Sequence, residues 1–299
     1  GEYGQLAERI INQLQLPYTS VNFLTESERV KDIALTHRTN LECAACLIYL
    51  LDYAMVAGDD NYRRLVSNLG YFDSWEVTNI RLLADVPEFL FDAIFRMSRA
   101  DLQRLGSRLK AKVQNAAKIS ISGRGSHLKV GVGEWYANDG QPTDHILPCG
   151  ELACIPTSMD GVVVVEGTML GTIPFGFKYG RIHAGDLILE FSDRHVVGVS
   201  GDNRDLVADV ETIFASLPAL RRVGEAAISF NTAIEHLPGI GYQWEEKYPG
   251  FHFGLGAELS ENLTTLSERE CDHHIDIILD RVDIHADAIP VFIDGQLRL

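Results

Sequence analysis

The sequence predicts an α+β protein, with a mostly helical N-terminal domain over residues 1–117 and a β-rich α/β domain over residues 118–299. Three observations carry this prediction. Apolar residues recur at helical spacing before residue 117. Beyond residue 118, glycines become frequent and separate short runs that are typical of strands. The length of 299 residues is also near the size at which one hydrophobic core divides into two.

The predicted N-terminal domain contains one strand among several helices. Helices are expected over residues 6–14, 25–34, 41–55, 87–97 and 98–117, and the strand over residues 79–84. Leu41–Met55 is the most apolar of these helices and is expected at the centre of the domain. Cys43 and Cys46 have the spacing of a redox motif, but inside an apolar helix they are interpreted as buried small side chains. Ser98 begins the last helix with a capping-box pattern.

The second predicted domain consists of strands joined by turns, with one helical segment. The clearest strands are residues 118–123, 161–166, 186–191 and 196–199. Asp202–Val223 is expected to form a helical hairpin, or one long helix broken near Pro218. Val282–Leu299 is expected to form strand and turn, with Asp294-Gly295 as a hairpin turn.

The composition excludes several classes of partner. The chain carries 42 Asp and Glu against 26 Lys and Arg, a formal charge of −16, so nucleic acid and anionic membrane surfaces would repel it. The apolar stretch of residues 46–57 is too short to span a bilayer, and no signal-peptide pattern stands at the N-terminus. Five cysteines do not form an even disulfide framework, which favours reduced thiols and a cytoplasmic location.

One His and one Asp stand two residues apart in an apolar, β-branched run near the C-terminus. Side chains at positions i and i+2 of a strand leave the same face, so His274 and Asp276 are placed to bind one metal ion together. The alternative is an ordinary His–Asp hydrogen bond at the end of a strand. His273 should point to the opposite face and is expected to support the site rather than to bind metal.

Three further residues upstream favour the metal interpretation. Glu151 follows a tight turn at the start of a strand, Glu225 interrupts an apolar run, and His252 lies among aromatic residues and glycines. A buried carboxylate needs a cation, for which Arg221 and Arg222 are the competing partners of Glu225. Two Glu, two His and one Asp form the mixed nitrogen and oxygen set that zinc, cobalt, manganese and iron accept. Residues 118–299 are therefore predicted to be a β-rich α/β metal-binding domain.

These motifs, in this order, resemble those of the thermophilic aminopeptidases of the aminopeptidase T and S type, a family of metallopeptidases with a dinuclear site. The matching stretches are Gly150-Glu151, Val223-Gly224-Glu225, His252–Gly256 and His274-Ile275-Asp276. The resemblance covers residues 118–299. It implies a metal-dependent hydrolase that acts on a peptide or small amide through metal-activated water, with Glu225 between two zinc, cobalt or manganese ions, and it implies a homodimer.

The sequence departs from the family at one catalytic position. The family has a Tyr seven residues after the ligand His, and this chain has Leu259 there. Hydrolysis would still need a general acid or base near the metals. The nearest residues of suitable type are Glu258, His273 and Tyr242, and these are the predicted catalytic residues.

Two other functions stay open at the level of the sequence. A mononuclear non-haem iron ring-opening dioxygenase would use a His, His and Asp set on the same scaffold, with iron as the cofactor. Retention of both Glu151 and Glu225 favours the dinuclear hydrolase over it. A peptide-tailoring enzyme of a biosynthetic pathway, which cyclises or binds its peptide, would fit the missing Tyr.

The segment Trp244–Tyr248 is interpreted as an exposed loop, with a substrate-facing wall as the alternative.

Overall fold

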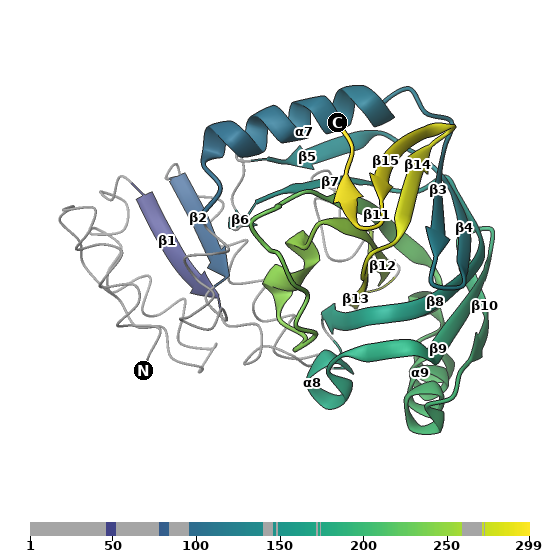
Figure 1. Ribbon diagram of the computed structural model, residues 1–299. Coiled ribbons are helices and arrows are strands. Elements are labelled where there is room, and N and C mark those ends of the chain that lie inside the picture. Colours follow the sequence, from purple (N-terminus) through teal and green to yellow (C-terminus); the bar gives the residue numbers. More distant parts are fainter. Residues whose placement is uncertain are drawn as a thin grey trace, which may run out of the picture.

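Most of the described chain belongs to one large β-sheet. The computed structural model describes residues 46–51, 78–83, 96–139, 146–147, 149–171, 173, 175–258, 271 and 273–299 (Figure 1). The sheet has 13 strands, and every pair of neighbours in it is antiparallel. Figure 1 shows that it curls into an open half-barrel.

The main path through the sheet runs β16-β15-β14-β3-β4-β8-β13-β12-β11-β7-β5, and β9 joins β8 to β10 beside this path. Its first strands in the chain are β3 (Lys118–Gly123), β4 (Ser126–Gly131), β5 (Trp135–Asn138), β7 (Glu151–Cys154), β8 (Ser158–Gly171), β9 (Ile182–Ser192) and β10 (His195–Ser200). The others are β11 (Val223–Ser229), β12 (Gly250–Gly256), β13 (His274–Leu279), β14 (Asp283–Ala286), β15 (Ile289–Ile293) and β16 (Gln296–Leu297).

A second sheet has three parallel strands, β1 (Cys46–Leu51), β2 (Thr78–Leu83) and β6 (Ile146–Leu147), in the order β1-β2-β6. The strand predicted over residues 79–84 is confirmed by β2. The helix predicted over residues 41–55 is wrong where the structure describes it, because residues 46–51 form β1. A continuous apolar run fits a buried parallel strand as well as a buried helix, and periodicity alone does not separate the two.

The predicted fold class is therefore wrong. The described residues are mostly strands, and their α-helices are α7 (Arg99–Val113), α8 (Phe175–Tyr179) and α9 (Arg204–Ser216). Short 3₁₀ helices are η2 (Pro218–Arg221) and η3 (Gln243–Lys247). The described residues do not show a mostly helical N-terminal domain. The helices predicted over residues 6–14 and 25–34 lie outside the described residues, and so does nearly all of the helix predicted over residues 87–97.

Among the described residues, no helix has the length and apolar character needed to cross a membrane.

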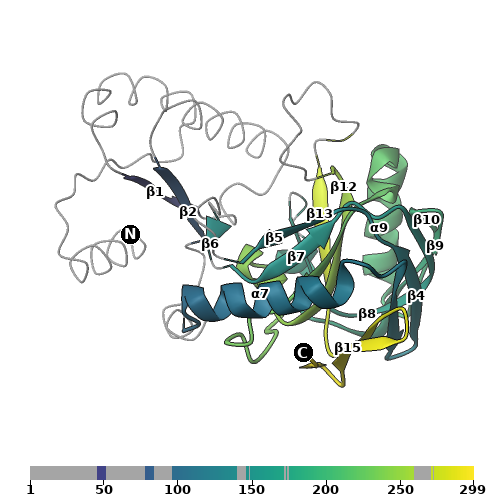
Figure 2. The same cartoon turned by 90° about the horizontal axis from the view of Figure 1, so that it is seen from above.

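Two helices pack against separate parts of the large sheet (Figure 2). The N-cap of α7 is Ser98, whose hydroxyl accepts a hydrogen bond from the backbone N–H of Asp101, as the capping pattern predicted. This helix packs against β5, β7 and β15. The helix α9 packs against β9 and β10 and ends just before Pro218, which begins η2, so the break predicted near that proline is confirmed.

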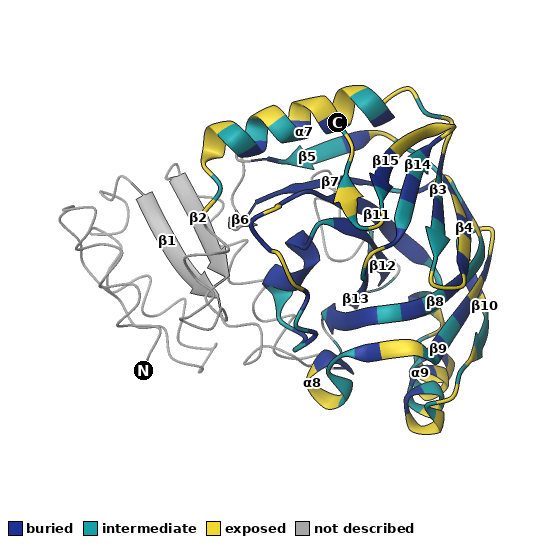
Figure 3. Ribbon diagram, viewed as in Figure 1, coloured by how far each residue is buried: buried dark blue, intermediate teal, exposed yellow. Residues whose placement is uncertain are grey.

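Several sequence predictions for the second half of the chain are confirmed. The four clearest strands correspond to β3, β8, β9 and β10. The turn between β15 and β16 contains Asp294 at φ 52° and Gly295 at φ 68°, as a tight hairpin turn requires. The hydrophobic core joins residues of the large sheet to residues of α7 and α9. The strands β7, β11, β12 and β13 are buried along their whole length (Figure 3).

The packing of α7 yields a stability prediction. Leu109 is fully buried against the sheet, whereas Arg108 beside it is exposed. We expect Leu109→Ala to lower the free energy of unfolding by about 2–5 kcal/mol, because it removes buried methyl groups and leaves a cavity. Urea denaturation measures this change. Arg108→Ala is the matched control and should change stability by less than about 0.5 kcal/mol; equal effects of the two substitutions would contradict the packing described here.

Candidate metal centre

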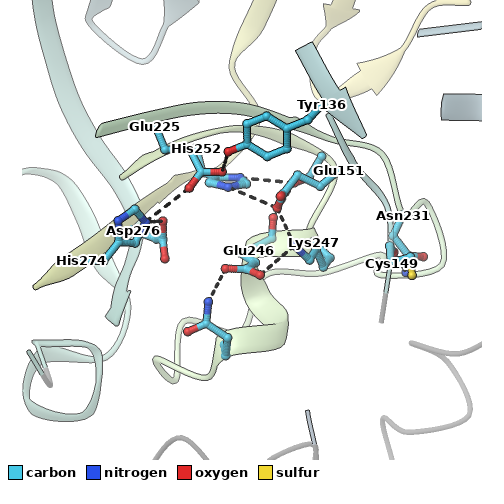
Figure 4. A network of polar contacts seen from close by, with 12 residues as sticks. Tyr136, Cys149, Glu151, Glu225, Asn231, Glu246, Lys247, His252, His274 and Asp276 are labelled. Atoms are coloured by element: carbon cyan, nitrogen blue, oxygen red, sulfur yellow. Dashed lines mark hydrogen bonds and ion pairs between the residues drawn. The ribbon is translucent and has the colours of Figure 1, made fainter. Parts of the chain in front are cut away.

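Four neighbouring strands bring the five predicted metal ligands to one face of the sheet (Figure 4). Glu151 begins β7, Glu225 lies on β11, His252 on β12, and His274 and Asp276 on β13. All five side chains are buried. Because β7, β11, β12 and β13 are consecutive in the sheet, residues far apart in the sequence become neighbours on one surface.

Gly254 leaves the space in which these side chains meet. In the strand register it lies between Glu225 on β11 and Asp276 on β13. A Cβ atom at Gly254 would stand 2.2 Å from Cε1 of His274 and 3.2 Å from Oδ1 of Asp276. Any larger side chain at this position would therefore fill the centre of the site.

The five residues form two groups that share one member. Glu151, Glu225 and His252 form the first group, and Glu225, His274 and Asp276 form the second. In each group, one possible ligand atom from every residue lies within 4.8 Å of the others. Glu225 belongs to both groups. This agrees with the family resemblance, which implied that Glu225 lies between two metal ions.

His274 is oriented as a metal ligand would be. Its Nδ1 lies 2.9 Å from the carbonyl oxygen of Ala257, which only accepts, so Nδ1 carries a proton. Its Nε2 lies 2.9 Å from Oδ1 of Asp276 and 3.5 Å from Oε2 of Glu225. Nε2 of His274, Oδ1 of Asp276 and Oε2 of Glu225 can all accept a hydrogen bond. They therefore require either a proton or a cation between them.

The protonation of this histidine follows from its neighbours. Burial lowers the pKa of His274, but the Asp276 and Glu225 carboxylates outweigh burial and raise that pKa well above its usual value. Burial likewise raises the pKa of Asp276, and the positive charge of His274 then brings it below its usual value. A proton on Nε2 of His274 thus occupies the place where a metal ion would bind.

His252 has the same orientation through a different partner. Its Nδ1 lies 3.2 Å from the hydroxyl oxygen of Ser229, and that hydroxyl donates its own hydrogen to the carbonyl of Glu246. The Ser229 oxygen therefore accepts from Nδ1 of His252, and Nε2 is left to face Oε2 of Glu151 at 3.6 Å. A hydrogen bond at one ring nitrogen commonly fixes the tautomer that binds metal through the other.

The site holds more negative than positive charge. Its buried carboxylates are those of Glu151, Glu225, Glu246 and Asp276, and its buried ammonium is that of Lys247. Four ionised carboxylates would exceed the Lys247 ammonium and the His274 imidazolium by two charges, and a proton on Glu246 lowers this excess to one. The remaining negative charge is costly away from water unless a cation compensates it. Mixed imidazole and carboxylate ligands suit zinc, cobalt, manganese or iron, so the donor set fits a divalent metal.

The three predicted catalytic residues make other contacts. Glu258 forms ion pairs with Arg194 at 2.8 Å and Arg222 at 2.6 Å. The ring of Tyr242 packs edge-on against Phe177. His273 is buried, and its carbonyl accepts a hydrogen bond from Ala257. Neither group of possible ligands among the described residues includes any of the three.

The segment Trp244–Tyr248 is buried, so the prediction of an exposed loop is wrong. Residues 244–247 of this segment belong to η3, which begins at Gln243. Glu245 anchors the preceding loop by accepting backbone hydrogen bonds from residues 239–242. The aromatic residues that flank the charged ones, Trp244 and Tyr248, are the signal in the sequence that favours burial.

Three residues in contact with the site were not predicted. Tyr136 on β5 donates its hydroxyl hydrogen to Oε1 of Glu225 at 3.1 Å, and burial, followed by Glu225, raises the pKa of the phenol above its usual range. Burial raises the pKa of Glu246 to about 8. Burial lowers the pKa of Lys247, but Glu151 and Glu246 outweigh burial and keep it above the usual range, so the ammonium is charged.

Comparison with known proteins places this site on a fold that is found in enzymes. No protein-family model matches the chain, and no curated protein matches it. Several solved structures share its fold, and two of them are enzymes. The 2,5-dihydroxypyridine dioxygenase of Pseudomonas putida KT2440 matches with a TM-score of 0.57 at 16% identity, over 95% of this chain and 81% of the other. Wild-type AmpT of Thermus thermophilus matches with a TM-score of 0.60 at 16% identity, over 92% and 80%.

At 16% identity, these matches show a shared fold. The motif resemblance to aminopeptidases thus extends to the fold of one of them, AmpT. A dioxygenase also has this fold, so the fold does not select the reaction. The arrangement of the site must therefore carry the functional argument.

The geometry predicts which substitutions remove metal. We expect Glu225→Ala to abolish stoichiometric metal binding, because Glu225 belongs to both groups. We expect Tyr136→Phe to weaken metal affinity by roughly 10–100-fold, because it removes the hydrogen bond that orients the Glu225 carboxylate. Plasma mass spectrometry of the purified variants, with circular dichroism to verify folding, measures both effects. Glu258→Gln is the control and should keep its metal. Full metal content in Glu225→Ala would show that the ion is held elsewhere.

Proposed function

We propose that this protein is a metal-dependent hydrolase that cleaves a peptide or small amide by metal-activated water. The observation that carries the proposal is the orientation of the two histidines. Both donate through Nδ1 to an oxygen outside the ligand groups, and both turn Nε2 toward buried carboxylates. The motif order, which resembles that of metallopeptidases, supports a hydrolase, and the fold shared with AmpT is compatible with that reaction.

A bound divalent ion would lower the pKa of a water molecule and polarise the carbonyl of the substrate. The chain supplies the remaining requirements. Glu225, His274 and Asp276 would hold the ion, while the Ala257 carbonyl fixes the ring of His274. Tyr136 donates to Glu225 and thereby holds the orientation of the carboxylate that both groups share.

Glu246 is the residue that we assign to proton transfer. Its carboxylate is buried beside Lys247 and belongs to neither ligand group. With a pKa raised to about 8 by burial, it exchanges a proton near neutral pH, as a general acid or base should. Glu246 thus takes the role for which Glu258, His273 and Tyr242 were considered from the sequence.

A second candidate is a mononuclear iron dioxygenase, which the similarity to the 2,5-dihydroxypyridine dioxygenase favours. His252, His274 and Asp276 would supply its ligands. Under this alternative, the iron-loaded protein consumes oxygen in the presence of an aromatic diol and does not release amine from aminoacyl anilides. A peptide-tailoring reaction would instead change the mass of a candidate peptide without cleaving it.

The proposal predicts a metal-dependent amidase activity that depends on Glu246. We expect protein loaded with zinc, cobalt or manganese to hydrolyse aminoacyl anilides, and a chelator to abolish this activity. Glu246→Gln should lower kcat by about 10²–10⁴-fold with unchanged metal content, because it removes the proton-transfer group and no ligand. Release of the aniline chromophore measures the rate. If the fully metal-loaded wild type cleaves no substrate across a panel of anilides and peptides, the hydrolase assignment fails.

A further inference from the structure

A lysine is buried inside the candidate metal centre. The side chain of Lys247 is 3% exposed, which is unusual because lysines are almost never fully buried unless they are paired. Its Nζ lies 2.5 Å from Oε2 of Glu151 and 2.7 Å from Oε1 of Glu246. Two carboxylates at these distances hold the ammonium in the site as a fixed positive charge.

The ammonium binds an oxygen that the first ligand group would otherwise offer to metal. Oε2 of Glu151 contacts Nζ of Lys247 and also faces Nε2 of His252 at 3.6 Å. A divalent ion held by Glu151 and His252 would lie next to the ammonium, and two cations at such a separation repel each other strongly in a buried site. The Lys247 ammonium thus already occupies the place of a cation beside Glu151 in the first ligand group.

In the second ligand group, the ion-pair partner described for the two carboxylates is the imidazole of His274 and not an ammonium. The ion pairs that the structure describes for Lys247 are with Glu151 and Glu246, and Figure 4 shows it on the Glu151 side of the site, away from His274 and Asp276. Once Nε2 of His274 gives up its proton, Glu225, His274 and Asp276 can together hold a metal ion.

The position of Lys247 is fixed by its surroundings. It closes η3, whose preceding loop is anchored by the Glu245 carboxylate. The next residue, Tyr248, donates its hydroxyl hydrogen to Asp280 at 2.7 Å. Gln243 donates to the other oxygen of Glu246. The ammonium has partners on both sides inside a buried segment, so it does not withdraw from Glu151 without breaking this packing.

We propose that Lys247 fills one of the two cation positions of this site, so that the chain binds a single divalent ion, at Glu225, His274 and Asp276. This inference rests on the proposed metal centre and replaces the dinuclear site that the family resemblance implied. Glu151 then holds Lys247 and is not a metal ligand.

The test is the stoichiometry of Mn²⁺, used alone as the probe, in the chain of 299 residues after treatment with a chelator. Plasma mass spectrometry gives the number of ions per chain, and electron paramagnetic resonance distinguishes isolated Mn²⁺ from a spin-coupled pair. We expect one isolated ion in the wild type and two coupled ions in Lys247→Met, which removes the charge and keeps an unbranched side chain. Lys247→Arg, which keeps the charge, is the matched control and should bind one ion.

A second variant keeps the inference testable if Lys247→Met does not fold. Glu151→Gln should retain one ion, because Glu151 binds the lysine, whereas a dinuclear centre would lose an ion. Two ions in the wild type, one ion in folded Lys247→Met, or loss of the ion in Glu151→Gln would each overturn the role of Lys247 and leave the proposed hydrolase standing. No ion in the wild type would overturn both.

Discussion

The burial of four carboxylates in one place is the constraint on which the functional part of this protein depends. Glu151, Glu225, Glu246 and Asp276 lie in the interior with one lysine among them. Unpaired charges are expensive away from water, so the fold is stable only if cations or protons accompany these groups. The two histidines, each held by an acceptor at Nδ1, are arranged so that a metal ion can meet that requirement. Stability and function thus depend on the same electrostatic arrangement.

The antiparallel sheet explains how distant residues reach one site. Because alternate residues of a strand share a face, one register across β7, β11, β12 and β13 aligns Glu151 with Ser229, and Glu225 with Asp276 on either side of Gly254. A shift by one residue would turn every ligand to the opposite face. The absence of a side chain at Gly254 is as much a part of the site as the ligands are.

The sequence predicted which residues meet at the site better than it predicted their surroundings. The five residues of the two groups follow from strand alternation at His274 and Asp276 and from short motifs around the others, and the structure brings them together. Lys247 and Tyr136 escaped prediction because they reach the site from a 3₁₀ helix and a separate strand, which only the fold makes adjacent. The helix predicted over residues 41–55 was wrong because its apolar run fits a parallel strand equally well. The strands β3, β8, β9 and β10 were predictable because turns bound them.

The most direct test of this account is anomalous X-ray diffraction from a crystal of the metal-loaded protein, measured at the absorption edge of the bound metal. The account predicts a peak within coordination distance of Nε2 of His274 and of the Glu225 and Asp276 carboxylates. A stoichiometric peak at another place in the chain, with none between these three side chains, would contradict it.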